Sequence, residues 1–108
     1  MANTFKLKTK ANVGVTTTNV YVVPSATTTV VIGVTLANTT GSSINVGIGI
    51  NRGANDNVKL MKSVPIPQGS SFEFMSGNKI VLETTDTFVA ESDVNSSLDV
   101  ALTIMEIT

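Results

Sequence analysis

Residues 46–53 contain three glycines in the order G-x-G-x-x-x-G, a relative of the fingerprint of dinucleotide-binding loops. In such a loop, backbone N–H groups at the start of a helix bind a pyrophosphate, so a strand must precede the glycines and a helix must follow them. Here Gly47 and Gly49 lie inside an alternating apolar pattern, and the polar residues 51–57 that follow show no helical periodicity. The sequence therefore disfavours a nucleotide site.

Glycine inside a strand is typical of a bulge, of strong curvature or of a close neighbour. In an oligomer, the flat glycine side of this strand would receive a neighbouring chain. Gly47 and Gly49 are therefore candidate interface residues. We expect replacement of Gly49 with glutamate to leave the fold largely intact while weakening assembly.

Oxygen-bearing side chains alternate at Glu91, Asp93 and Asn95, and loops of β-sandwiches can hold Ca²⁺ with such ligands. The set is incomplete and lacks the order of an EF-hand, so we prefer solvated turn residues and keep calcium as the alternative. No two carboxylates have a defined separation that would indicate glycoside hydrolysis. We expect no metal, no cofactor and no catalytic residue.

Lys6, Lys8 and Lys10 alternate with uncharged residues and form the basic cluster of the chain. Lysines on one face of a strand commonly protect the edge of a sheet, and we prefer this interpretation. The alternative is an arm that reaches an acidic neighbour or a phosphate. On that alternative, Lys6 and Lys8 are candidate interface residues.

The absence of histidine and cysteine from the 108 residues excludes most enzyme mechanisms, including a Ser-His-Asp triad and thiolate metal sites. The net charge is −1, and charged residues make up 14% of the chain, so neither nucleic acid nor a membrane surface is an expected partner. No apolar run suggests a signal peptide or a membrane-spanning helix. We expect a non-enzymatic protein made in a cytoplasm.

β-Branched residues crowd the long segments, and clusters of Gly, Pro, Asn and Ser interrupt them. This pattern predicts an all-β chain, namely a single antiparallel β-sandwich, jelly-roll or immunoglobulin-like, of about eight strands. We expect one domain over residues 1–108, with a short N-terminal arm or strand at residues 1–18. The expected strands are residues 5–9, 19–23, 28–37, 44–50, 58–63, 71–75, 79–83, 87–91 and 97–104.

Alternation within these strands predicts which side chains form the core. The expected core residues are Val22, Ile32, Val34, Leu36, Val46, Ile48, Leu60, Phe72, Phe74, Leu82, Phe88, Val100 and Leu102. Residues 30–32 and 104–107 carry apolar side chains on both faces of their strands. We expect part of this second face to be buried against another chain, which makes Met105 and Ile107 candidate interface residues.

Four short patterns connect the chain to a known group of proteins. They are Tyr21-x-Val23-Pro24, Leu36-Ala37-Asn38-Thr39, Pro65-Ile66-Pro67-x-Gly69 and Val81-Leu82-x-x-x-Asp86-x-Phe88. With them, the chain resembles small virion structural proteins of tailed bacteriophages, particularly marine and cyanobacterial phages. In that family a glycine commonly stands immediately before the aspartate, where this chain has Thr85.

The resemblance implies a β-sandwich that assembles into particles and has no catalytic residue. The expected function is a virion structural protein, foremost a capsid decoration or cement protein, located in the virion. A neck, tail or baseplate/fibre component is the alternative within the same class, and a host-glycan-binding module is the alternative from another class. The expected partners are the phage capsid or other virion proteins, together with further copies of the chain in a homo-oligomer.

Overall fold

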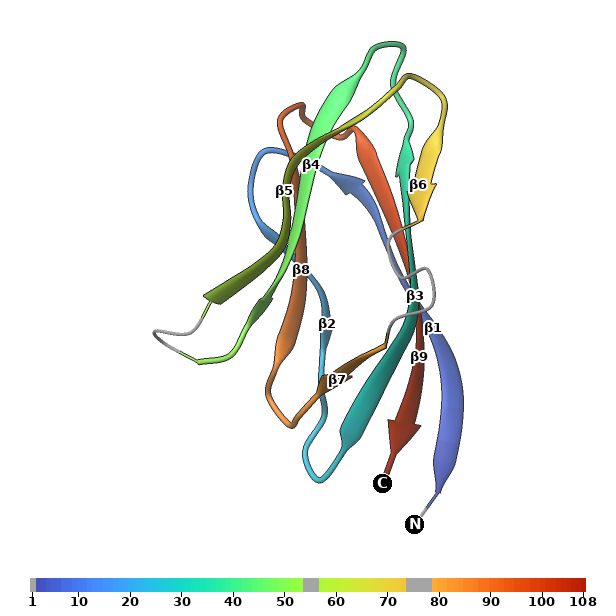
Figure 1. Ribbon diagram of the computed structural model, residues 1–108, viewed down its shortest axis with the longest axis vertical. Helices are drawn as coiled ribbons and strands as arrows, with labels where there is room; N and C mark the ends of the chain where they lie inside the picture. Colours follow the sequence, from blue (N-terminus) through green and yellow to red (C-terminus); the bar gives the residue numbers. More distant parts are fainter. Residues whose placement is uncertain (1, 54–56, 74–78) are drawn as a thin grey trace.

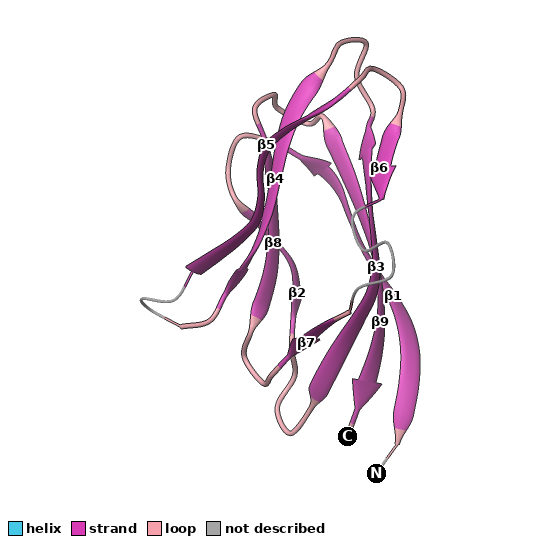
Figure 2. Cartoon of the chain, in the orientation of Figure 1, coloured by secondary structure: helices cyan, strands magenta, loops and turns pink. Residues whose placement is uncertain are grey.

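A computed structural model describes residues 2–53, 57–73 and 79–108. These residues form nine strands and no helix (Figures 1 and 2). The strands are β1 (Asn3–Val13), β2 (Thr18–Val22), β3 (Thr28–Asn38), β4 (Ile44–Asn51), β5 (Asn57–Ile66), β6 (Ser71–Glu73), β7 (Ile80–Leu82), β8 (Thr87–Ser92) and β9 (Leu98–Ile107).

The strands make two antiparallel sheets that face each other (Figure 1). Sheet A has the order β1-β9-β3-β6, with β7 also paired to β3, and sheet B has the order β2-β8-β4-β5. Because β6 and β7 pair with different parts of β3, they share one place in sheet A. The first strand thus pairs with the last, β2 with β8, β3 with β6 and β7, and β4 with β5, which is the jelly-roll arrangement. The expected β-sandwich is confirmed.

The alternating segments build the two inner faces of the sandwich. In β4, Ile44, Val46, Ile48 and Ile50 are all buried, as the period-two pattern predicts. In β9, the alternate residues Leu98, Val100, Leu102 and Ile104 are also buried. Phe88 of β8 lies fully buried between the sheets, so the expected core is confirmed at its centre.

Register shifts overturn part of the expected core. In β3, the pairing with β9 shifts between Val31 and Gly33, so the alternation changes phase and Ile32 is only half-buried. In β2, the pairing with β8 shifts between Asn19 and Tyr21. Tyr21 then points inward, and Val22 remains 50% exposed.

Edge positions account for the other differences from the expected core. Phe72 lies on the short edge strand β6 and is 37% exposed, and Leu60 on the edge strand β5 is half-buried. Phe74 lies outside the described residues. Phe72 and Leu60 are partly exposed because a strand at the edge of a sheet has a neighbour on one side only.

The N-terminal segment forms a strand, β1, along the edge of sheet A. It pairs with β9 from Asn3 opposite Ile107 to Val13 opposite Leu98. Beyond these pairs, the backbone N–H groups of Ala2 and Thr108 each donate to the carbonyl oxygen of the other residue. The two ends of the chain therefore lie side by side (Figure 1).

In the turn before β8, Thr85 adopts a backbone conformation that favours glycine. Thr85 has a φ of 74°, in the left-handed region that glycine adopts without steric cost. The conformation is enforced by two backbone hydrogen bonds, from Thr85 N–H to the Val23 carbonyl and from Asp86 N–H to the Glu83 carbonyl. A β-branched residue is strained in this conformation.

We expect Thr85→Gly to stabilise the fold by about 1 kcal/mol, because relief of the strain exceeds the extra entropy of glycine in the unfolded chain. Urea unfolding measures the change. Thr17→Gly is the matched control, since Thr17 is exposed in a loop and has no left-handed φ. The control should be neutral or destabilising, and an equal gain in both variants would contradict the explanation.

Candidate interaction surface

The solvent side of sheet A carries an apolar patch, which we call the outer A face. It is formed by side chains of β1, β3, β7 and β9 that point away from the core. Its members are Phe5, Leu7, Val30, Ile32, Val81, Met105 and Ile107. Phe5, Leu7 and Val81 are 70%, 64% and 59% exposed, and the other members are half-buried.

Strand register aligns the patch across the sheet. Phe5 pairs with Met105, Met105 pairs with Val30, and Val30 pairs with Val81. Directly opposed side chains on neighbouring strands lie about 4.5–5.5 Å apart at Cβ, so these residues form a continuous apolar row over four strands. Large exposed apolar patches of this kind mark interaction sites.

The positions beside this row on β1, β9 and β3 are uncharged, whereas Lys79 and Glu83 lie two positions on either side of Val81 at its β7 end. On one side Ile107 pairs with Asn3 and with Thr28, and on the other side Thr103 pairs with Leu7 and with Gly33. The candidate interface residues Met105 and Ile107 therefore lie together on an uncharged, apolar part of sheet A.

Lys6 and Lys8 point to the opposite side of β1 and have partners within the chain. Lys6 Nζ lies 2.8 Å from Oε1 of the buried Glu106, and Lys8 Nζ lies 5.9 Å from the centre of the Tyr21 ring. Inward-pointing lysines protect an edge strand from pairing with other chains. The geometry therefore favours the protected edge over an extended basic arm.

Tyr21 joins the two sheets next to these lysines. Its hydroxyl donates to Glu106 Oε2 at 2.6 Å and lies 2.8 Å from Thr29 Oγ1. Burial, followed by the hydrogen bond to Glu106, raises the pKa of Tyr21 to about 12. The hydrogen bonds from Lys6 and from Tyr21 lower the pKa of Glu106. Sequence alone did not reveal this network, because its members lie as far apart in the chain as Lys6 and Glu106.

The lowered pKa of Glu106 predicts acid sensitivity. Its carboxylate is favoured in the fold, so its contribution is present above its ordinary pKa of 4.5 and is lost as the pH falls through the lowered value. We expect Glu106→Gln to cost about 1–2 kcal/mol at pH 7 and much less in acid, measured by urea unfolding at pH 7 and pH 3. Glu91→Gln, which removes the exposed ion pair with Lys59, is the control. Equal losses for Glu106→Gln at both pH values would contradict this account.

The two strand glycines are covered by their own chain, which corrects the expectation of a neighbouring chain on them. Both are buried, and β5 shifts register opposite them. A Cβ atom on Gly49 would lie 2.5 Å from the Val58 carbonyl oxygen, and one on Gly47 would lie 3.1 Å from that of Met61. The close neighbour admitted by the glycines is therefore strand β5, and the expectation that the fold tolerates glutamate at Gly49 is wrong.

The acidic side chains singled out for calcium are engaged with other residues. Asp93 accepts hydrogen bonds from the N–H and the side-chain amide of Asn45, and Glu91 accepts one from Lys59 at 2.6 Å. The part of the chain that the structure describes holds no group of three or more Asp and Glu side chains placed to bind a metal ion. A groove of about 410 Å³ lies beside them on sheet B, with Lys62 also in its lining.

Within the described ranges, every buried side-chain nitrogen or oxygen has a hydrogen-bond partner. In the same ranges, no helix of the length and apolarity needed to cross a membrane is present.

Comparison with known proteins gives one informative likeness. No protein-family profile matches the chain, and a search of curated proteins finds no significant match. Among solved structures, the chain is similar to one from work describing Bacillus endospore appendages as a novel family of disulfide-linked pili. That match has a TM-score of 0.59 and 14% identity, and it covers 99% of this chain and 87% of the other. At this identity the likeness shows a shared fold.

Proposed function

We propose that the chain is a non-enzymatic structural subunit of a bacteriophage virion, and most specifically a capsid decoration or cement protein. The observation that supports the proposal is the outer A face, an uncharged apolar surface on a small domain whose described residues offer no catalytic constellation. The resemblance of the Tyr21, Pro65 and Asp86 patterns to phage virion proteins supports the choice of particle.

A decoration protein occupies many equivalent positions on a symmetric shell. Weak contacts at each position then sum to strong attachment, because each bound copy is held near its next contact. The jelly roll is suited to this role, since its core is complete within one chain and its outer faces remain available for contacts. The side-chain amide of the buried Asn38 donates to the carbonyl groups of Ser42, Ile66 and Pro67, and it thereby ties the end of β3 to the end of β5 within the single chain.

Particles that lack the chain provide the test. Purified chain added to them should bind to saturation at hundreds of copies and raise their melting temperature, and cryo-EM should place it on the shell. Bovine serum albumin added at equal concentration is the control for nonspecific adsorption. Unchanged particle stability together with the absence of copies on the shell would refute the decoration role.

A neck, tail or fibre position is the second candidate, and the fold supports it. The structural neighbour comes from work that describes endospore appendages as pili. The neighbour's pili are described as disulfide-linked, whereas this chain has no cysteine, so its contacts with other subunits would be noncovalent. Six or twelve copies in a ring, in place of hundreds on the shell, would select this position.

The host-glycan module has less support. Sugar rings are usually stacked on an aromatic ring beside polar groups that bind their hydroxyls. The chain has no Trp, Tyr21 is 6% exposed with its hydroxyl bound to Glu106, and the exposed Phe5 lies in an apolar row. Binding of the chain to a glycan array would support this hypothesis. The structure leads us to expect no binding.

A further inference from the structure

We propose that the outer A face binds the same face of a second copy of the chain, so that two sandwiches stack about a two-fold axis. The inference builds on the proposed structural role and names the partner of one surface. It concerns the chain alone, so it can be tested without particles.

The charge distribution points to a second copy. The residues of the apolar row from Phe5 to Val81 carry no charge, and the lysines of β1 point to the other side of the strand. Charged residues flank the row at its β7 end, where Lys79 and Glu83 lie two positions on either side of Val81. Nucleic acid or an anionic lipid requires several cations on the contact surface, and the residues of this row supply none. A suitable partner must be apolar, uncharged and flat over the same span. The chain itself supplies such a surface, and two copies meet without like charges.

The geometry permits the contact. Sheets stack about 10 Å apart with their strands within about 30° of each other, and a two-fold interface uses the same patch twice. With the axis through the middle of the row, the row of one copy lies on the row of the other. Met105 and Val30 occupy that middle, so each faces an apolar side chain of the second copy. Asp99 pairs with Ala37 and Glu73 pairs with Thr35, at the other end of the sheet. Glu106, which is next to Met105 in the chain, points inward to Lys6 and Tyr21.

Analytical ultracentrifugation of the purified chain over a concentration series tests the inference. We expect a dimer, and we expect Met105→Glu to weaken it at least tenfold, because two carboxylates would be buried without partners. Val22→Glu is the matched control, since Val22 is half-exposed on the outside of sheet B, and it should remain dimeric. Urea unfolding checks that each variant folds. If Met105→Glu does not fold, the double variant Phe5→Ser and Leu7→Ser replaces it, since both side chains are highly exposed.

Crosslinking provides an independent measurement, because the chain has no cysteine of its own. Facing residues in stacked sheets are too far apart for a direct disulfide, which needs Cα atoms within about 7 Å. A short bismaleimide should therefore join two copies of Met105→Cys and leave Val22→Cys monomeric.

A wild-type chain that stays monomeric to roughly 100 µM would overturn the inference, as would a dimer unaffected by the variants of the outer A face. These outcomes are distinct from failure of the proposed function. A dimer that does not bind particles would leave the inference standing and refute the decoration role, whereas a monomer that decorates particles would do the reverse.

Discussion

Replacement of Gly49 with alanine should destabilise the protein by about 3 kcal/mol, the largest effect that we expect from a single methyl group. The added Cβ would lie 2.5 Å from the Val58 carbonyl oxygen, a distance that no relaxed contact allows. The obstacle is backbone of β5, which is held to β4 by the pairs of Ile50 with Val58 and of Gly49 with Lys59, so it cannot turn aside as a side chain would. Urea unfolding of the purified variant measures the loss.

Two other glycines serve as comparisons for the stability loss expected of Gly49→Ala. Gly47→Ala should cost less, because its Cβ would lie 3.1 Å from the Met61 carbonyl oxygen and a small shift relieves the contact. Gly41→Ala should be neutral or slightly stabilising, since nothing lies within 4 Å of its added Cβ and its φ is not left-handed. From the most to the least stable variant, the expected order is therefore Gly41→Ala, Gly47→Ala and Gly49→Ala. A Gly49→Ala protein as stable as wild type would show that β5 is not fixed against the glycines.

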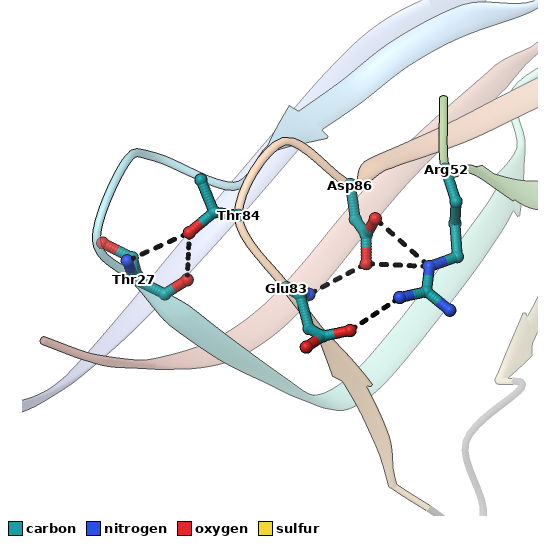
Figure 3. A network of polar contacts seen from close by, with 5 residues as sticks. All are labelled: Thr27, Arg52, Glu83, Thr84 and Asp86. Carbon is teal, nitrogen blue, oxygen red and sulfur yellow. Dashed lines mark hydrogen bonds and ion pairs between the residues drawn. The ribbon is translucent and has the colours of Figure 1, made fainter. Parts of the chain in front are cut away.

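Replacement of Asp86 with alanine should cost about 2–4 kcal/mol. The Asp86 carboxylate is almost fully buried and accepts hydrogen bonds from Arg52 Nε, at 3.2 Å to each oxygen, and from Glu83 N–H at 2.8 Å (Figure 3). It thereby ties the end of β4 to the turn before β8. Alanine would leave the Glu83 N–H and the guanidinium without this acceptor. Thermal and urea unfolding measure the cost.

Glu83 supplies the control for this prediction. It forms an ion pair with the same Arg52, at 2.7 Å, but its side chain is 71% exposed. Glu83→Gln should therefore change stability by less than about 1 kcal/mol, and the change should vanish in 1 M salt. The loss caused by Asp86→Ala should persist in that salt, because a buried carboxylate is poorly screened. Similar losses for both variants would show that burial does not distinguish the two acids.

Sequence patterns predict those parts of the fold that depend on local alternation. The period of two in β4 and β9 identified eight buried residues correctly, because a strand between two neighbours in a sheet has one face fixed against the core. Turn residues also located the strands to within a few positions. Met105 and Ile107 were identified as surface apolar residues for the same reason, since they alternate with buried Ile104 and Glu106.

Other features depend on contacts between distant segments, which local patterns do not encode. The bulge at Ile32 and the shift at Tyr21 each change the phase of a strand, and nothing near them in the sequence signals the change. The close contact of Gly49 with β5 could not be predicted either, because it depends on the way β5 bends onto β4. One signal was available for the outer A face: Phe5 and Leu7 alternate with the lysines, so they had to share the side of β1 opposite the charges.

The bend of β5 over the glycines has a consequence for how many partners the protein can take. On sheet B, strand β5 covers the part of the outer surface formed by Gly47 and Gly49. On sheet A, apolar side chains of the outer surface remain exposed. The two sides of the sandwich are therefore unequal, and under the pairing that we propose for the outer A face each copy would stack through sheet A. A subunit with one self-complementary face forms a closed dimer, because a filament requires two different faces that bind each other in successive copies. Any larger assembly of this chain would need contacts of another kind, made by its edges and loops.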